Sequence, residues 1–181
     1  MLLTNHNNSR EDRVKTIEKL MDEHGTSIKR LIFTYVKHWE TASDLTQDVF
    51  LTVFEKLDTF QGRSSLKTWV FSIAINKSKD YLKSWHFNHI LLHKISNKDT
   101  NKTPEEEIMS QHDRKELYNN ILTLPPKYRE LIFLHYYNDM TVKEISEVTG
   151  LPAATIKTRL YRGKEKLKKK LNLKESGELY G

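Results

Sequence analysis

The stretch TVKEISEVTGLPAATIKTRLYRGKEKL, residues 141–167, decides how the C-terminal part of this chain folds. Thr141, followed three residues later by Glu144, forms the capping-box pattern that starts a helix. Gly150 suits the left-handed backbone of a tight turn between two helices. Pro152 suits the first turn of the second helix, because no N–H is needed there. This pattern predicts a helix-turn-helix rather than a simple helical hairpin.

Apolar and polar side chains separate along the second of these helices. Ile156, Leu160 and Leu167 recur at helical spacing and are expected to hold the helix against a core. The residues left facing outward are mostly basic or hydroxyl-bearing, as in a recognition helix that enters the major groove of DNA. We predict that this outward set binds duplex DNA: Thr155, Lys157, Thr158, Tyr161, Arg162 and Lys166.

The net charge of the chain, +6 over 181 residues, is concentrated in the same region. Residues 141–175 contain ten Lys and Arg against four Glu, so this segment accounts for the whole excess and the rest is nearly neutral. A concentrated basic segment attracts nucleic acid through counterion release. A solvated, lysine-rich terminal helix would have the same composition, so the charge alone leaves both interpretations open.

The composition excludes several classes of protein. The chain has no cysteine, which rules out disulfide scaffolds, thiolate zinc sites and cysteine nucleophiles. No run approaches the roughly 18 apolar residues that cross a bilayer, and the polar N-terminus lacks the apolar stretch of a secretory signal. We therefore expect a cytoplasmic protein that does not insert into a membrane. Six Gly and four Pro indicate long helices rather than a β-sandwich.

Helical periodicity occurs in two blocks, which predicts an all-α fold of two small helical domains joined by a flexible linker. The first domain is assigned to residues 10–87 and the second to residues 112–175, which ends in the helix-turn-helix. Between them, residues 88–111 are assigned to the linker, because the stretch NKDTNKTPEEE at 97–107 has almost nothing to bury. Pro125-Pro126 is expected to separate the first two helices of the second domain.

The first domain is expected to contain three or four helices. Gly25 is predicted to break or bend the first helical stretch, because glycine weakens a helix. Ser64 or Ser65 is a suitable N-cap for a helix of about twenty residues, Leu66 to Trp85. Within that helix, Trp69 is assigned to the buried apolar stripe.

Two segments of the first domain carry surface chemistry. DLTQDVFLTVFEKLDTF, residues 44–60, places mainly acidic and amide side chains on one flank of an amphipathic helix: Asp44, Gln47, Asp48, Leu51 and Glu55. FQGRSSLKTWVFSIAINKSKDYLKSW, residues 60–85, joins a glycine-containing loop to a helix that mixes aromatic residues with lysines. Such a mixture suits single-stranded DNA, because bases stack on rings while lysines follow the phosphates. An aromatic core stripe with a solvated lysine face is the alternative.

In this order and spacing, the segments make the chain similar to the extracytoplasmic-function (group IV) sigma factors of bacterial RNA polymerase. The resemblance covers residues from about 15 to 171. It includes DLTQDVF at 44–50, FQG at 60–62, TWV at 68–70, IAIN at 73–76 and LPPKYR at 124–129.

The resemblance implies a role for each segment. The helix around residues 44–57 would dock on the coiled-coil clamp of the polymerase's largest subunit, and the helix-turn-helix would read the −35 element. The loop at 60–65 and the helix after it would bind the melted −10 element and receive a flipped base, with these residues in contact: Phe60, Arg63, Ser64, Lys67, Asn76, Lys77, Lys79 and Lys83. The resemblance also implies core RNA polymerase, promoter DNA and an anti-sigma factor as partners, a monomer when free, and no cofactor.

Other functions fit parts of the pattern. A one-component helix-turn-helix regulator would bind DNA as a dimer without polymerase. A metal-dependent nuclease would use Asp44 and Asp48, which lie one helical turn apart. His86, His89 and His93 would share one face of a continued helix and could bind zinc. Since no carboxylate or thiol completes that set, we expect no metal site. The sequence shows no Ser-His-Asp order, Gly-rich phosphate loop or zincin motif, so we expect no enzymatic activity.

Overall fold

The computed structural model describes residues 3–84 and 112–178, and every regular element in these two ranges is helical. The predicted all-α class is therefore confirmed. The chain divides into two compact units, the first built mainly from Met1–Ser84 and the second from residues that follow. The predicted linker and the three candidate zinc ligands lie outside the described residues: 88–111, His86, His89 and His93.

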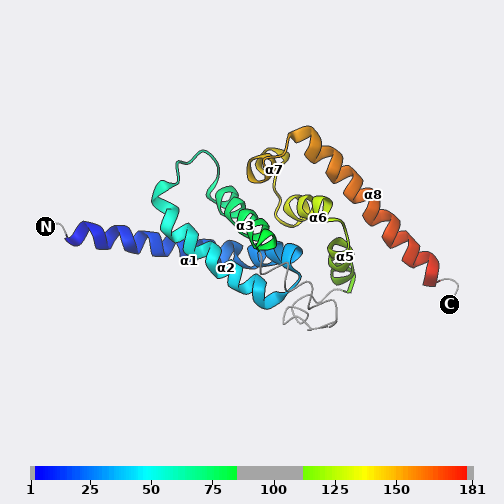
Figure 1. The fold of residues 1–181 in the computed structure, drawn as a ribbon, viewed down its shortest axis with the longest axis horizontal. Coiled ribbons are helices and arrows are strands. Elements are labelled where there is room, and N and C mark those ends of the chain that lie inside the picture. Colours follow the sequence, from blue (N-terminus) through cyan, green and yellow to red (C-terminus); the bar gives the residue numbers. More distant parts are fainter. Residues whose placement is uncertain (1–2, 85–111, 179–181) are drawn as a thin grey trace. The chain divides into compact units, whose positions relative to one another are not determined.

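Three long helices form the first unit: α1 (Leu3–Val36), α2 (Trp39–Lys56) and α3 (Leu66–Lys83). Each contacts the other two, and Figure 1 shows them in blue, cyan and green. A short 3-10 helix, η1 (Leu57–Thr59), follows α2 directly. All three long helices contribute fully buried side chains to one core: Ile28, Leu31, Ile32, Ala42, Val49, Val53, Val70, Phe71, Ala74 and Ile75.

Helix α1 continues through Gly25 without interruption, so the predicted break there is wrong. Glycine costs a helix interior only about 0.5–1 kcal/mol relative to alanine. Burial of a side chain such as Ile28 contributes about 1.5–3 kcal/mol, and several are buried along this helix. The chain turns instead at Lys37, whose φ is 58°, and His38 then caps α2 by accepting a hydrogen bond from the backbone N–H of Thr41.

Helix α3 is rotated relative to the sequence-based assignment. Trp69 is half-buried rather than part of the core, whereas Phe71 and Ile75 are fully buried. The buried face also contains Ser78, whose hydroxyl donates to the carbonyl of Ala74 at 2.8 Å. Val70 and Ala74 of the predicted stripe are fully buried, but Trp69 is not. Because a hydroxyl that is satisfied inside its own helix can be buried at little cost, hydrophobicity alone did not place Ser78 on the buried face.

The second unit consists of shorter helices followed by one long one. They are α5 (His112–Leu122), α6 (Pro126–Ile132), the π-helical turn η3 (Phe133–Tyr137), α7 (Val142–Thr149) and α8 (Ala153–Glu178). The break predicted at Pro125-Pro126 is confirmed, since α5 ends before it and α6 begins at Pro126. In Figure 1, α7 leads through a short turn into α8, and α8 packs against α6 and α5.

Arg129, the charged residue at the end of the LPPKYR stretch, has a structural role. Only 7% of its surface is exposed, and its Nη1 donates to the backbone carbonyls of Leu122 and Leu124 at 2.9 and 3.2 Å. The last carbonyls of a helix have no partner within it. The guanidinium supplies that partner at the end of α5 and so fixes the turn between α5 and α6.

Candidate nucleic-acid interface

The helix-turn-helix forms as the sequence predicts. The hydroxyl of Thr141 accepts from the Glu144 N–H at 3.2 Å, while the carboxylate of Glu144 accepts from the Thr141 N–H at 2.8 Å, which completes the capping box. Gly150 adopts φ 71° and ψ 10°, the left-handed conformation expected at the turn. Pro152 lies just before the first residue of α8, and its carbonyl accepts from the Ile156 N–H at 3.1 Å.

One face of α8 is fixed against α6. Ile156 is fully buried, and Leu160 and Leu167 are each 8% exposed. Between them, a Cβ at Gly163 would lie only 3.1 Å from Cγ1 of Ile132, so the missing side chain allows the two helices to approach closely. No sequence pattern marks this glycine, because its role depends on the neighbouring helix. Because these contacts fix the rotation of α8, they also determine which side chains face away from the core.

All six residues predicted to bind duplex DNA lie off the buried face of α8. Thr155 is half-buried, and the other five are exposed; Tyr161 has 67% of its surface accessible. At 3.6 residues per turn, Thr158, Tyr161 and Arg162 lie opposite the core, with Lys157 on one flank and Lys166 on the other. The Nζ of Lys166 is also 6.0 Å from the centroid of the Tyr128 ring, and the Thr158 hydroxyl donates to the carbonyl of Ala154 at 2.9 Å.

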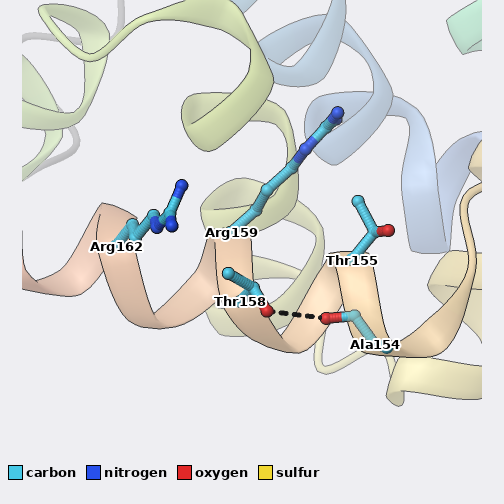
Figure 2. A pocket seen from close by; sticks show the side chains of 5 residues that line it. All are labelled: Ala154, Thr155, Thr158, Arg159 and Arg162. Atoms are coloured by element: carbon cyan, nitrogen blue, oxygen red, sulfur yellow. Dashed lines mark hydrogen bonds between the residues drawn. The ribbon is translucent and has the colours of Figure 1, made fainter.

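An open depression of about 310 Å³ lies on α8, as Figure 2 shows. It is lined by Ala154, Thr155, Thr158, Arg159 and Arg162, and both guanidinium groups extend from the same side of the helix. Arg159 is not among the residues predicted to bind duplex DNA, although its position four residues after Thr155 and three before Arg162 places it beside them. Guanidinium groups and hydroxyls on one surface suit phosphate oxygens and guanine edges.

The acidic flank of α2 is exposed along its whole length. Asp44, Gln47, Asp48, Leu51 and Glu55 all face solvent, on the side opposite the buried Val49 and Val53. Leu51 is 61% exposed. Within the described ranges, no ion pair involves any of the three carboxylates. A large apolar side chain surrounded by acids is typical of a surface that binds a basic partner.

The loop between η1 and α3 is anchored at both ends. At its start, the Phe60 N–H donates to the Leu57 carbonyl at 3.1 Å, and the Phe60 ring lies 5.1 Å from the Trp69 ring. At its end, the Ser65 hydroxyl caps α3, which confirms one of the two predicted caps. Gly62 has φ 65°, and Arg63 at the tip is exposed. The loop therefore presents its tip to solvent from fixed ends.

Only part of the predicted single-strand set is brought together on α3. Asn76 is exposed on the same side of the helix as Trp69, two turns further on, and Lys83 follows after two more turns. Lys83 is not an isolated cation, because its Nζ lies 3.7 Å from the carboxylate of Asp80. The remaining three lysines, Lys67, Lys77 and Lys79, are half-buried. Of these, Lys67 and Lys77 lie on other sides of the helix.

No group of three His, Cys, Asp or Glu side chains in the described ranges is placed to hold a metal ion, so Asp44 and Asp48 have no third ligand there. None of the helices that the structure describes is both long and apolar enough to span a bilayer.

Two family models match the two units. Sigma-70 region 2 matches residues 20–86, and Sigma-70, region 4 matches residues 114–167, together more than half of the chain. The fold, the helix-turn-helix and these matches define a sigma factor of the sigma-70 family. The ECF RNA polymerase sigma factor SigW of Bacillus subtilis is 26% identical over 177 residues, which cover 88% of this chain and 95% of SigW. The ECF RNA polymerase sigma-E factor of Haemophilus influenzae is 25% identical over 167 residues, covering 87% and 88%.

The chain belongs to the extracytoplasmic-function RNA polymerase sigma factors, as the sequence resemblance predicted. Solved structures share its fold. The sigma factor RpoE, in complex with the anti-sigma factor NepR from Bartonella quintana, has a TM-score of 0.73 at 20% identity, over 87% of this chain and 98% of that one. CnrH, in complex with the cytosolic domain of CnrY, has a TM-score of 0.64 at 19% identity, over 92% and 94%. A one-component regulator is therefore not favoured.

Proposed function

We propose that this sigma factor binds core RNA polymerase through α2 and selects promoters through two DNA contacts, one in each unit. The observation that carries the −35 contact is the outward face of α8, where Thr158 and Arg162 are exposed while the opposite face is buried against α6. Arg162 is suited to a bidentate contact with guanine, which is worth about 1–3 kcal/mol of discrimination.

The loop at residues 60–65 and the outward face of α3 are proposed to bind the melted −10 strand. The adjoining rings of Phe60 and Trp69 offer an apolar surface on which a base can stack, and Asn76 supplies an amide for a base edge. Trp69 joins this set because it is half-buried beside Phe60 rather than enclosed in the core. Lys67 and Lys77 lie away from that face, so they are proposed to contact phosphates at its edges.

The exposed flank of α2 is proposed to dock on a basic, partly apolar surface of the polymerase's largest subunit. Leu51 would be the apolar centre, with Asp48 and Glu55 one turn to either side. Acids that have no ion pair within the described chain are available for such a partner. We propose that the protein acts in the cytoplasm, where core polymerase is found. When free it would be a monomer, with no catalytic role or cofactor of its own.

An anti-sigma factor is proposed as the controlling partner. The support is that RpoE, which shares this fold, was solved in complex with the anti-sigma factor NepR. Specific affinity that is split between two tethered units is lost when simultaneous engagement is blocked. A protein that covers the α2 flank or keeps the units from binding together would therefore silence the factor.

Run-off transcription with purified core polymerase on a promoter library tests this proposal. We expect transcription that depends on both a −35 and a −10 element, and a complex of the chain with core polymerase on gel filtration. Arg162→Ala should weaken use of particular −35 sequences, while Lys15→Ala, an exposed cation on α1, should change nothing. A homodimer that footprints palindromic DNA and ignores core polymerase would refute the proposal.

A further inference from the structure

Arg13 ties the first half of α1 to the segment that precedes the loop at 60–65. Its Nη1 lies 2.8 Å from Oδ2 of Asp58 in η1, across 45 residues of sequence. Its guanidinium carbon lies 5.6 Å from the centroid of the Phe54 ring at the end of α2. The side chain is 28% exposed, and its Nε is buried. One guanidinium thus contacts both elements that lead into the loop.

This contact differs from other ion pairs of the described residues. Lys19 pairs with Glu23 and Lys83 with Asp80 within a single helix, and all four side chains are at least half exposed. Such pairs contribute little, because water competes for both charges. Water also reaches the Asp58 carboxylate, whose side chain is 68% exposed. Arg13 differs because it joins separate elements, and because its planar group lies over a ring while it donates to that carboxylate.

The position of Phe60 depends on that of η1, because Phe60 follows η1 directly and is hydrogen-bonded to it. η1 has only three residues, and the Phe60 N–H donates to the carbonyl of Leu57, its first residue. The Phe60 ring then packs against Trp69. A displacement of Asp58 would therefore shift the ring that begins the loop, without touching the residues at the tip.

We propose that Arg13 is a positioning residue for the −10 loop: through Asp58 and Phe54 it holds Phe60 where an unpaired base can stack on it. This inference rests on the proposed function, in which the loop at 60–65 binds the melted −10 strand. Arg13 itself contacts no DNA in this scheme. Its effect is to keep the loop in its binding conformation before the DNA arrives, which removes an ordering cost from the affinity.

The test uses holoenzyme assembled from core polymerase and the full chain, with a fork DNA whose −10 non-template strand is single-stranded. Fork affinity is measured for Arg13→Ala, Asp58→Ala, the double variant and Arg13→Lys, with Lys19→Ala as the matched control in α1. Each alanine variant should bind the fork about two- to fivefold more weakly, and the double variant no more weakly than either single one. Arg13→Lys should fall between, because lysine keeps the charge but loses the planar stacking. Core affinity and Lys19→Ala should stay at wild-type values.

Three results would overturn the inference. If Asp58→Ala strengthens fork binding while Arg13→Ala weakens it, Arg13 acts on the phosphates directly. If core affinity and thermal stability fall in step with fork affinity, the pair serves only the fold of the first unit. If wild-type holoenzyme discriminates between −10 sequences and all variants do so equally well, the pair has no positioning role although the proposed function stands. A wild-type holoenzyme without −10 discrimination would refute the proposed function itself.

Discussion

Substitution of Gly163 by alanine tests whether close approach to α6 holds the recognition helix. Alanine in a helix interior stabilises by about 0.5–1 kcal/mol relative to glycine. Here the new Cβ would lie 3.1 and 3.3 Å from Cγ1 and Cδ1 of Ile132 and 3.4 Å from Cβ of Tyr128. Ile132 is 1% exposed and cannot move into solvent, so overpacking should cost about 1–3 kcal/mol. We expect a net loss of about 1 kcal/mol in the stability of the second unit.

The chain contains a matched control for this substitution. Gly25 also lies inside a helix, and a Cβ there would have no neighbour within 4 Å. Gly25→Ala therefore receives the same gain in helix propensity without any overpacking. It should stabilise the first unit by about 0.5–1 kcal/mol. The opposite signs of two identical substitutions isolate the contribution of the contact with Ile132.

Hydrogen exchange on the full chain measures both units separately, since amides report the local free energy of opening. Gly163→Ala should speed the exchange of amides in α6 and α8 about fivefold, while α1 and α3 keep their protection. Binding to a −35 duplex should weaken in parallel, because α8 would lose its fixed rotation. If Gly163→Ala slows exchange in α6 and α8 as Gly25→Ala does in α1, the close approach does not restrain the recognition helix.

Three further variants probe single contacts. Thr141→Ala should lower the stability of the second unit by about 1 kcal/mol in denaturant titration, because the capping box with Glu144 is lost; an unchanged midpoint would show that the cap contributes nothing. Arg129→Leu should cost about 1–3 kcal/mol in the same titration, because the hydrogen bond from Arg129 to the buried carbonyl of Leu124 is lost; a neutral result would contradict that role. Leu51→Ala should leave stability unchanged but weaken core polymerase binding by about 1–2 kcal/mol in a fluorescence titration; unaltered binding would place the docking surface elsewhere.

The helix-turn-helix could be predicted from sequence because its signals are local. The capping box at Thr141 and the positive φ of Gly150 each depend on residues within one turn, and both occur as predicted. The rotation of α3 could not be predicted in this way. The hydrophobicity of Trp69 predicts a core residue. Only the packing of the three helices shows that Phe71 and Ser78 are fully buried while Trp69 is not.

The contacts that set the candidate sites were also invisible to sequence patterns. Arg13 and Asp58 are 45 residues apart, and Gly163 matters only because Ile132 lies against it. No periodicity links such pairs, since each depends on how separate helices cross. Arg159 is different, because its spacing from Thr155 and Arg162 already placed it beside them on one flank of α8.

In both units, the surface proposed to bind DNA is positioned by a contact between residues that do not themselves belong to that surface. Gly163 sets the rotation of α8 against Ile132, and Arg13 anchors η1 ahead of Phe60. Two moderate DNA contacts on tethered units give high combined affinity only when both units are in their binding conformation at the same time. When disruption of either support adds about 1 kcal/mol to the free energy of adopting the DNA-binding conformation, promoter affinity should fall about fivefold, although every side chain proposed to contact DNA is retained. Residues behind the interface should influence promoter strength as much as several of those on it.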